Sequence, residues 1–224
     1  MHVDIPKLPM DSFKDLAKHY LMIVLGILTA LGLEAWIEHA HHVHAAEAAS
    51  AQIEAEIHDN RIAIQAALDN AQARTNLLAK VRDDLIQDIK SNATDTIIIQ
   101  HIHAEAPDGL YLDWRWPTLR HEAWDVAVAN QSAGWIDNDK LHRYAKVYAA
   151  QNTRAMLATT EIQLVLDGPR MLNAIVDLET GDLQPRELLH SVNQMWGAQR
   201  DGSQNLILLA KTIDDAMGNQ AASH

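Results

Sequence analysis

The amino-acid sequence predicts an all-α protein, in which an N-terminal transmembrane helix continues as a long stalk helix into an antiparallel helical bundle. Three observations support this prediction. The 224 residues are rich in alanine but contain only 9 glycines and 6 prolines, a composition that favours helices. Residues 20–33 form an uncharged apolar run, YLMIVLGILTALGL. Beyond residue 50, apolar residues recur in steps of three, four or seven, which is the spacing of one helix face.

The apolar run is bracketed by Lys18 and Trp36. A helix between these two residues covers roughly 27 Å, close to the ~30 Å thickness of the hydrocarbon layer. Lys18 can extend its ammonium group to one interface, while Tyr20 and Trp36 are rings that favour the headgroup level. The sequence therefore predicts a transmembrane helix over residues 20–37.

Two alternatives to a membrane span stay open. The run is short for a span, so it also suits a buried helix of a soluble protein. A cleaved signal peptide is the second alternative, but Asp4, Asp11 and Asp15 precede the run. No good cleavage site follows, because Leu33 stands where a small residue belongs.

Basic residues predict the orientation of the span. Lys7, Lys14 and Lys18 precede it, and the next basic residue is Arg61. The positive-inside rule then keeps residues 1–19 in the cytoplasm and exports residues 38–224. We expect a single-pass protein of a bacterial inner membrane with a periplasmic domain.

Composition excludes several classes of function. The chain has no cysteine, which excludes disulfides, thiolate zinc sites and a cysteine nucleophile. Residues 1–19 are neutral, so the net charge of −12 lies beyond residue 33, and such an acidic domain lacks the cationic surface that nucleic acid requires.

The exported part begins with the continuation of the first helix. The helix is expected to end at residues 91–94, and Asp59 and Asn60 allow a local break. The β-branched run 96–102 and the aromatic run 110–117 flank a turn, which predicts a small β-hairpin near residues 96–116.

Two short helices and two longer ones complete the prediction. A short helix is expected over residues 118–129, and Asp137 or Asn138 caps the next, which stops at residues 167–169. Another short helix covers residues 170–178. Pro185 suits the first turn of the last helix, which the glycines near its middle are expected to loosen.

The most conspicuous polar feature is a histidine run just beyond the span. Glu38, His41 and His42 share a helix face, and His44 follows. Imidazole and carboxylate groups at this spacing suit Zn²⁺, Ni²⁺ or Cu²⁺, and parallel stalks of an oligomer could complete the coordination. The two alternatives are a solvated collar outside the membrane and a pH sensor.

Two further candidate sites concern partners and ligands. Gly26 and Ala30 form a small-xxx-small pair that suits a helix–helix contact in the membrane, or is ordinary residue usage in a span. A second group is aromatic and basic, and its rings either line a ligand pocket or form the bundle core. Its members are Tyr111, Trp114, Arg115 and Trp116, with His121 and Trp124 nearby.

No catalytic motif is present. The sequence has no nucleophile elbow, P-loop, dinucleotide fingerprint, zinc-protease motif or EF-hand loop. The paired carboxylates at Asp83, Asp84 and Asp88 and at Asp214 and Asp215 lie on polar helix faces, where solvation explains them. We therefore expect a protein that is not an enzyme.

The chain resembles an uncharacterised bacterial family, a domain of unknown function made of small single-pass membrane proteins. The resemblance covers roughly residues 20–150. It rests on residues 23–31, Trp36, Glu38, Glu56, Ile57 and Asn60, and on the later positions Trp124, Asp125, Ser132, Gly134, Ile136, Leu141, Tyr144 and Tyr148. It implies an N-terminal anchor and a helical exported domain, and it implies no activity.

These observations predict a membrane-anchored structural or interaction protein, an accessory subunit that docks on other inner-membrane proteins or on itself. The alternative is a periplasmic module that binds or senses a ligand or metal without an output domain of its own. A third possibility is an enzyme or metal-handling protein that uses the histidine run.

Overall fold

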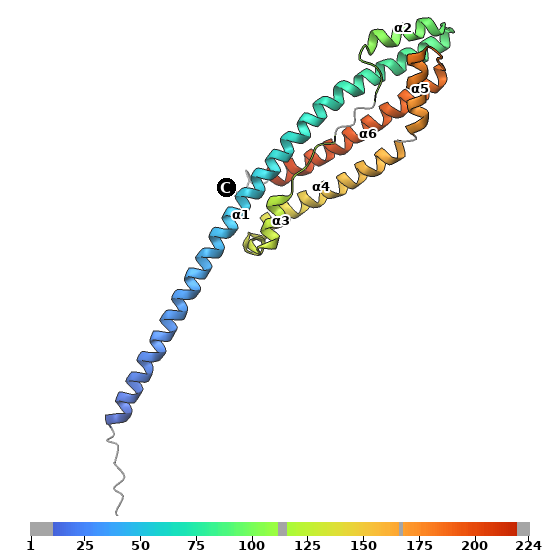
Figure 1. Cartoon of the computed structure of the whole chain (residues 1–224). Helices are drawn as coiled ribbons and strands as arrows, with labels where there is room; N and C mark the ends of the chain where they lie inside the picture. The colour runs from blue at the N-terminus through green and yellow to red at the C-terminus, as the bar shows by residue number, and fades with distance from the viewer. Residues whose placement is uncertain (1–10, 112–115, 166–167, 219–224) are drawn as a thin grey trace, which may run out of the picture.

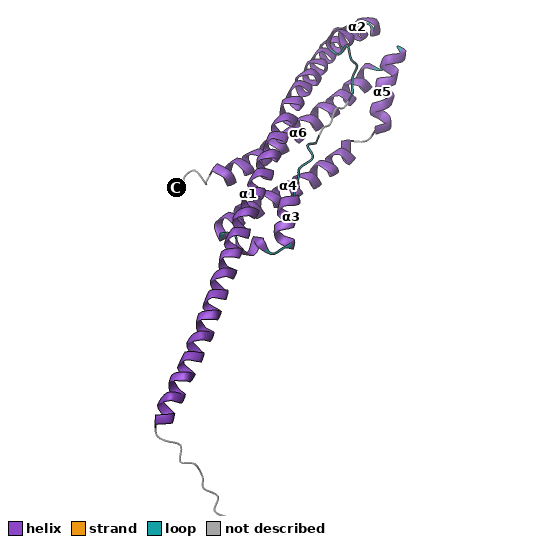
Figure 2. Cartoon of the chain, turned by 60° about the vertical axis from the view of Figure 1, so that its left-hand side comes forward, coloured by secondary structure: helices purple, strands orange, loops and turns teal. Residues whose placement is uncertain are grey.

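The structure, a computed structural model, describes residues 11–111, 116–165 and 168–218 (Figure 1). The part of the chain that it describes is helical and contains no strand, so the all-α prediction is confirmed (Figure 2). The elements are α1 (Asp11–Ser91), α2 (Asp95–Glu105), α3 (Glu122–Ala129), the 3₁₀ helix η1 (Ser132–Trp135), α4 (Asn138–Val165), α5 (Gly168–Thr180) and α6 (Pro185–Gly218).

Helix α1 is a single uninterrupted helix of 81 residues. It does not break at Asp59 and Asn60, because Asn60 is buried and uses its side chain to hold another segment. It ends where the sequence predicts, since Asn92 takes a left-handed conformation with φ 56° and the amide of Ala93 bonds to the carbonyl of Asp88.

The two halves of α1 have different surroundings. Side chains from Phe13 to Ala45 are exposed, apart from the partly buried Val24 and His42. From Ala46 onward one face of the helix is buried, and residues 46–218 are called the packed domain below. The exposed half extends well away from it (Figure 1).

Three long helices organise the packed domain. Helix α6 lies along the second half of α1 and also packs against α4. Helix α3 and η1 lie at the end of the packed domain nearer the exposed half of α1, while α2 and α5 lie at the far end (Figures 1 and 2).

The core consists of two hydrophobic clusters along this length. The near cluster lies beside α3 and η1, and its most buried large side chains are Ile53, Ile57, Ile64, Tyr144, Leu209 and Ile213. The far cluster lies beside α2 and α5 and contains Leu78, Val81, Leu85, Ile98, Leu188 and Met195. Burial of these side chains is the main stabilising contribution to the fold.

The predicted β-hairpin near residues 96–116 is wrong. Residues 95–105 form helix α2, whose buried side chains Ile98 and Ile102 lie four residues apart on one helix face. Both pack in the far cluster with Leu78 and Leu85 of α1. This tertiary burial outweighs the strand preference of a β-branched run.

Local signals predict the later helix starts well. Asp137 caps α4 by accepting hydrogen bonds from the amides of Asp139 and Lys140, and α6 begins at Pro185. Helix α6 runs through both of its central glycines. Helix α3 starts at Glu122 and not at residue 118, because side chains of α1 hold the backbone of Arg120 and Ala123.

Candidate functional site

The predicted membrane contact lies on the exposed half of α1. Gly26 and Ala30 are both exposed, and a Cβ built on Gly26 meets no atom within 4 Å. The part of α1 around them is the one stretch among the described residues that is long and apolar enough to cross a membrane, and none of it is buried. None of the residues that the structure describes covers this surface.

The histidine run lies at the base of the packed domain. His42 stacks on Trp135 of η1 with ring centroids 3.9 Å apart and planes 10° apart, and its Nε2 lies 3.6 Å from a Glu38 carboxylate oxygen. Glu38, His41 and His44 are exposed. This contact brings η1 onto α1.

The histidine run does not form a complete metal site within one chain. No group of three or more His, Asp or Glu side chains among the described residues could hold one ion. The proposed completion by parallel stalks of an oligomer stays a prediction, since it needs more than one chain.

The predicted aromatic group is divided between two places. Tyr111 lies under Arg74, whose guanidinium carbon is 4.0 Å from the ring centroid and which also donates to the Tyr111 carbonyl. Trp114 and Arg115 lie outside the described residues. Trp116 is half-buried and packs against the near cluster.

A cavity lies beside Trp116. It has a volume of about 770 Å³, is partly open to solvent, and is enclosed by residues 116–121, α3 and α4. Trp116, His121 and Trp124 of the predicted aromatic group line it, and Tyr111 does not. Its volume falls within the ~300–1,000 Å³ typical of small-molecule sites.

Two buried polar side chains of α1 hold the wall of this cavity. The Asn60 side chain accepts from the amide of Arg120 at 2.8 Å and donates to the Arg120 carbonyl at 2.7 Å. Glu56 accepts from the amide of Ala123 at 2.9 Å. The backbone of residues 120–123 is therefore attached to α1 by hydrogen bonds from side chains of that helix.

Tyr148 connects this network to the cavity. Its hydroxyl donates to the second oxygen of Glu56 at 2.6 Å, and its ring stacks on Trp124 with centroids 5.2 Å apart. Burial, and then the hydrogen bond to Glu56, raise the pKa of Tyr148 well above its ordinary value. The phenol therefore stays protonated and fixed in position.

Gln151 is an unusual member of the cavity wall. It lies on α4, lines the cavity and is only 5% exposed. Its side-chain nitrogen is buried and has no hydrogen-bond partner among the described residues. Such a group costs about 1–3 kcal/mol, so its presence requires an explanation.

The rim of the cavity carries one ion pair. His121 Nδ1 lies 2.6 Å from a carboxylate oxygen of Asp125, one helical turn further on. The hydrogen bond to Asp125 and its negative charge raise the pKa of His121. Both side chains are largely exposed, so the pair contributes little to stability.

Sequence reasoning had assigned no role to most of this framework. Glu56 and Tyr148 are positions of the resemblance alone, Asn60 is in addition a position where a helix break is expected, and no pattern singles out Gln151. The available signal for Gln151 is its position on the α4 face that carries Tyr144 and Tyr148, at spacings of seven and three residues.

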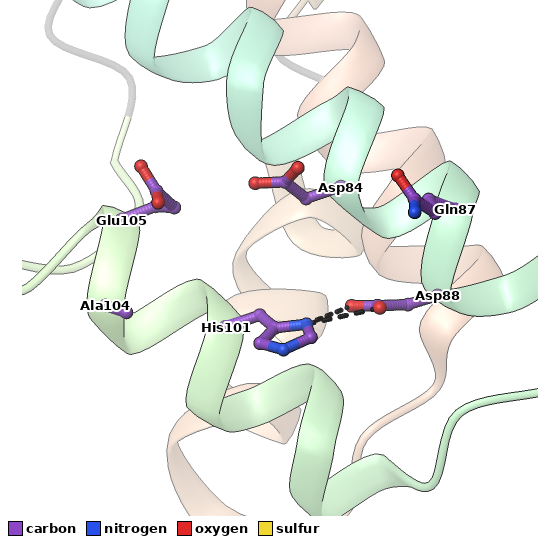
Figure 3. Close-up of a pocket in the computed structure, with 6 residues that line it drawn as sticks. All are labelled: Asp84, Gln87, Asp88, His101, Ala104 and Glu105. Atoms are coloured by element: carbon purple, nitrogen blue, oxygen red, sulfur yellow. Dashed lines mark hydrogen bonds and ion pairs between the residues drawn. The ribbon is translucent and has the colours of Figure 1, made fainter. Parts of the chain in front are cut away.

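A second, smaller hollow of about 240 Å³ lies between α1 and α2 (Figure 3). It is polar, and two pairs of side chains connect α1 and α2 around it. His101 Nδ1 lies 2.9 Å from a carboxylate oxygen of Asp88, and Lys80 Nζ lies 2.5 Å from one of Glu105. Figure 3 shows the contact between His101 and Asp88. These pairs tie α2 to α1, which is a structural role.

Compared with models of known protein families, with curated proteins and with solved structures, the chain matches none of them.

Proposed function

We propose that the chain is a membrane-anchored interaction protein. Residues 20–37 of α1 cross the membrane once, and the packed domain is held outside it. The observation that supports this proposal most directly is that residues 20–33 are uncharged, apolar and exposed within one helix that continues into the core. A core helix of a soluble protein would bury such a run.

The continuity of α1 sets how the packed domain is presented. Residues 38–45 join the anchor to the packed domain as helix, without glycine or proline. The packed domain therefore cannot move freely relative to the anchor, as it would on a flexible linker. A partner therefore meets the packed domain at a fixed distance from the membrane and in a fixed orientation.

The basic residues before the span support a cytoplasmic N-terminus. Lys7, Lys14 and Lys18 precede the span, while Arg61 is the first basic residue after it. In a bacterium, this orientation exposes the acidic packed domain to the periplasm.

The surfaces that remain exposed support interaction with other proteins of the membrane or with a second copy. Gly26 and Ala30 let a neighbouring helix approach closely within the lipid. Exposed apolar side chains continue at the base of the packed domain, where Val126, Val128 and Trp135 are each about half exposed (52–53%).

Purification from membranes in a mild detergent tests the proposal. We expect the protein in the membrane fraction, with residues 20–36 retained in peptide mapping, and a stoichiometric membrane partner or a homo-oligomer after purification. Gly26→Leu/Ala30→Leu should weaken that association, and Gly32→Leu, at another position of the same apolar helix, is the matched control. A monomer without a partner, or a mature chain lacking residues 20–36, would contradict the proposal.

A further inference from the structure

The cavity beside α4 has flat apolar walls. The rings of Trp124 and Tyr148 stack with an angle of 25° between their planes, and Trp116 adds a third ring. Ala145 and Ala149 on the facing helix are small and leave the space open. Aromatic faces of this kind favour ring-shaped apolar ligands.

The walls are also fixed before any ligand arrives. Glu56 and Asn60 hold residues 120–123 through three backbone hydrogen bonds of 2.7–2.9 Å. Glu56 also holds the hydroxyl of Tyr148. A ligand would not have to order these groups, so less of its binding free energy would be lost.

Gln151 supplies the polar contact that such a site needs. Its amide nitrogen is a donor without an acceptor, buried in the wall of an otherwise mainly apolar cavity. No residue in the described part of the chain offers this nitrogen an acceptor. A hydrogen-bond acceptor on a ligand would remove its energetic cost.

The charges around the cavity favour an uncharged ligand. His121 and Asp125 at the rim are paired with one another at 2.6 Å and neutralise each other when the histidine is protonated. The third titratable side chain in the wall, Tyr148, is kept neutral by its environment. The net charge of −12 disfavours anions in addition.

We infer that this cavity binds a small uncharged molecule that has an apolar ring system and one hydrogen-bond acceptor, such as a carbonyl oxygen. The rings lie against Trp124 and Tyr148, and the acceptor faces Gln151. This inference does not depend on the membrane anchor, because the whole cavity belongs to the packed domain.

Photolabelling of the full chain in detergent micelles with benzophenone tests the inference. Benzophenone is uncharged, has two aromatic rings and a carbonyl acceptor, and attaches to nearby C–H bonds on illumination. We expect peptide mapping to find the label within residues 116–124 and 145–155. Labelling of residues 20–36, which the micelle covers, is the internal positive control.

Two substitutions on α4 make the test specific. Ala149→Trp fills the cavity and should remove the label from both segments, while Thr153→Trp, on the same helix but outside the cavity wall, should leave it unchanged. No label in the cavity segments of the wild-type protein would overturn the inference. So would a label that Ala149→Trp leaves unchanged, or that both variants remove equally.

Gln151→Leu provides a second readout that does not depend on folding of the filled variant. It keeps a side chain of similar size and removes the donor, so cavity labelling should fall about fivefold. The Tm of the ligand-free protein should rise by several degrees, because an unpaired buried amide is lost. A fall in Tm with unchanged labelling would show that Gln151 serves the fold alone.

Discussion

The two halves of α1 belong to one helix but differ in how their side chains are buried. Residues 13–45 expose their side chains almost all around, and within them residues 20–33 have no charge. Residues 46–91 bury only one face, which carries Ile53, Ile57 and Ile64 in the near cluster and Leu78, Val81 and Leu85 in the far one.

Helix continuity alone therefore does not define a domain. The helical hydrogen bonds are the same in both halves, but the packed half is stabilised by other helices, whereas the apolar half has no packing partner among the described residues.

The largest difference is expected from one substitution placed in each half. Ile57 is fully buried, and Ile27 is 54% exposed. Ile57→Ala should lower the free energy of unfolding of the packed domain by about 2–5 kcal/mol. Ile27→Ala should leave it unchanged, in urea titrations of the full chain in micelles followed by circular dichroism. Equal losses would contradict the division of α1 into two halves.

Asn60 tests whether the packed half also positions the cavity wall. Asn60→Ala leaves the amide and carbonyl of Arg120 without their partner, so we expect a loss of about 1–3 kcal/mol. Asn76 is exposed on the same helix and accepts a hydrogen bond from Gln72, one turn earlier, so Asn76→Ala should change the unfolding free energy by less than about 0.5 kcal/mol. Similar losses for both would exclude a special role for Asn60.

Alkaline pH should weaken the packed domain through its buried tyrosines. Burial and hydrogen bonds to Glu54 and Glu56 raise the pKa values of Tyr144 and Tyr148. Below pH 10 these phenols are neutral in both states. Above pH 10 the unfolded chain ionises first, so each tyrosine removes about 1 kcal/mol of stability by pH 11.

Unfolding measured between pH 9 and 11 checks this effect. Tyr148→Phe should be less stable at pH 7, because Glu56 loses a donor, but should show a shallower decline above pH 10 than the wild type. An unchanged slope would contradict the raised pKa of Tyr148.

The smallest effect on stability is expected from the His121–Asp125 pair at the rim of the cavity. Asp125 raises the pKa of His121, so the stabilising contribution of the pair is complete below about pH 6.5 and is lost as the pH rises through the folded-state pKa. Both groups are exposed, so the change is at most a few tenths of a kcal/mol. In urea titrations at pH 5.5 and 8.5, His121→Gln should abolish this pH-dependent difference in the free energy of unfolding. A larger loss of unfolding free energy in His121→Gln would contradict the description of the pair as exposed and weakly stabilising.

The parts of the fold that could be predicted from the sequence depend on local physics. Ser91, Asp137 and Pro185 mark helix ends through backbone and capping preferences that need no distant contact. Residues 96–102 show the opposite case, because their helical state depends on burial of Ile98 and Ile102 against α1. A β-branched run without that information predicts a strand.

The cavity was predicted only in part for a similar reason. Trp116, His121 and Trp124 are close in sequence, so their clustering is visible without a structure. Tyr148 meets Glu56 across a separation of 92 residues, and Asn60 meets Arg120 across 60. Such pairings follow from how the long helices pack, and no pattern within either segment reveals them.

Cysteine accessibility in intact spheroplasts tests the central claim most directly, because the chain has no cysteine of its own. Single cysteines at Ser12, Ala30 and Gln52 would be treated with a membrane-impermeant maleimide. We predict that the Gln52 position reacts in intact spheroplasts, the Ser12 position only after lysis, and the Ala30 position only after the membrane is dissolved in denaturant. Rapid reaction at the Ala30 position in intact spheroplasts, or reaction at the Ser12 position without reaction at the Gln52 position, would contradict the account.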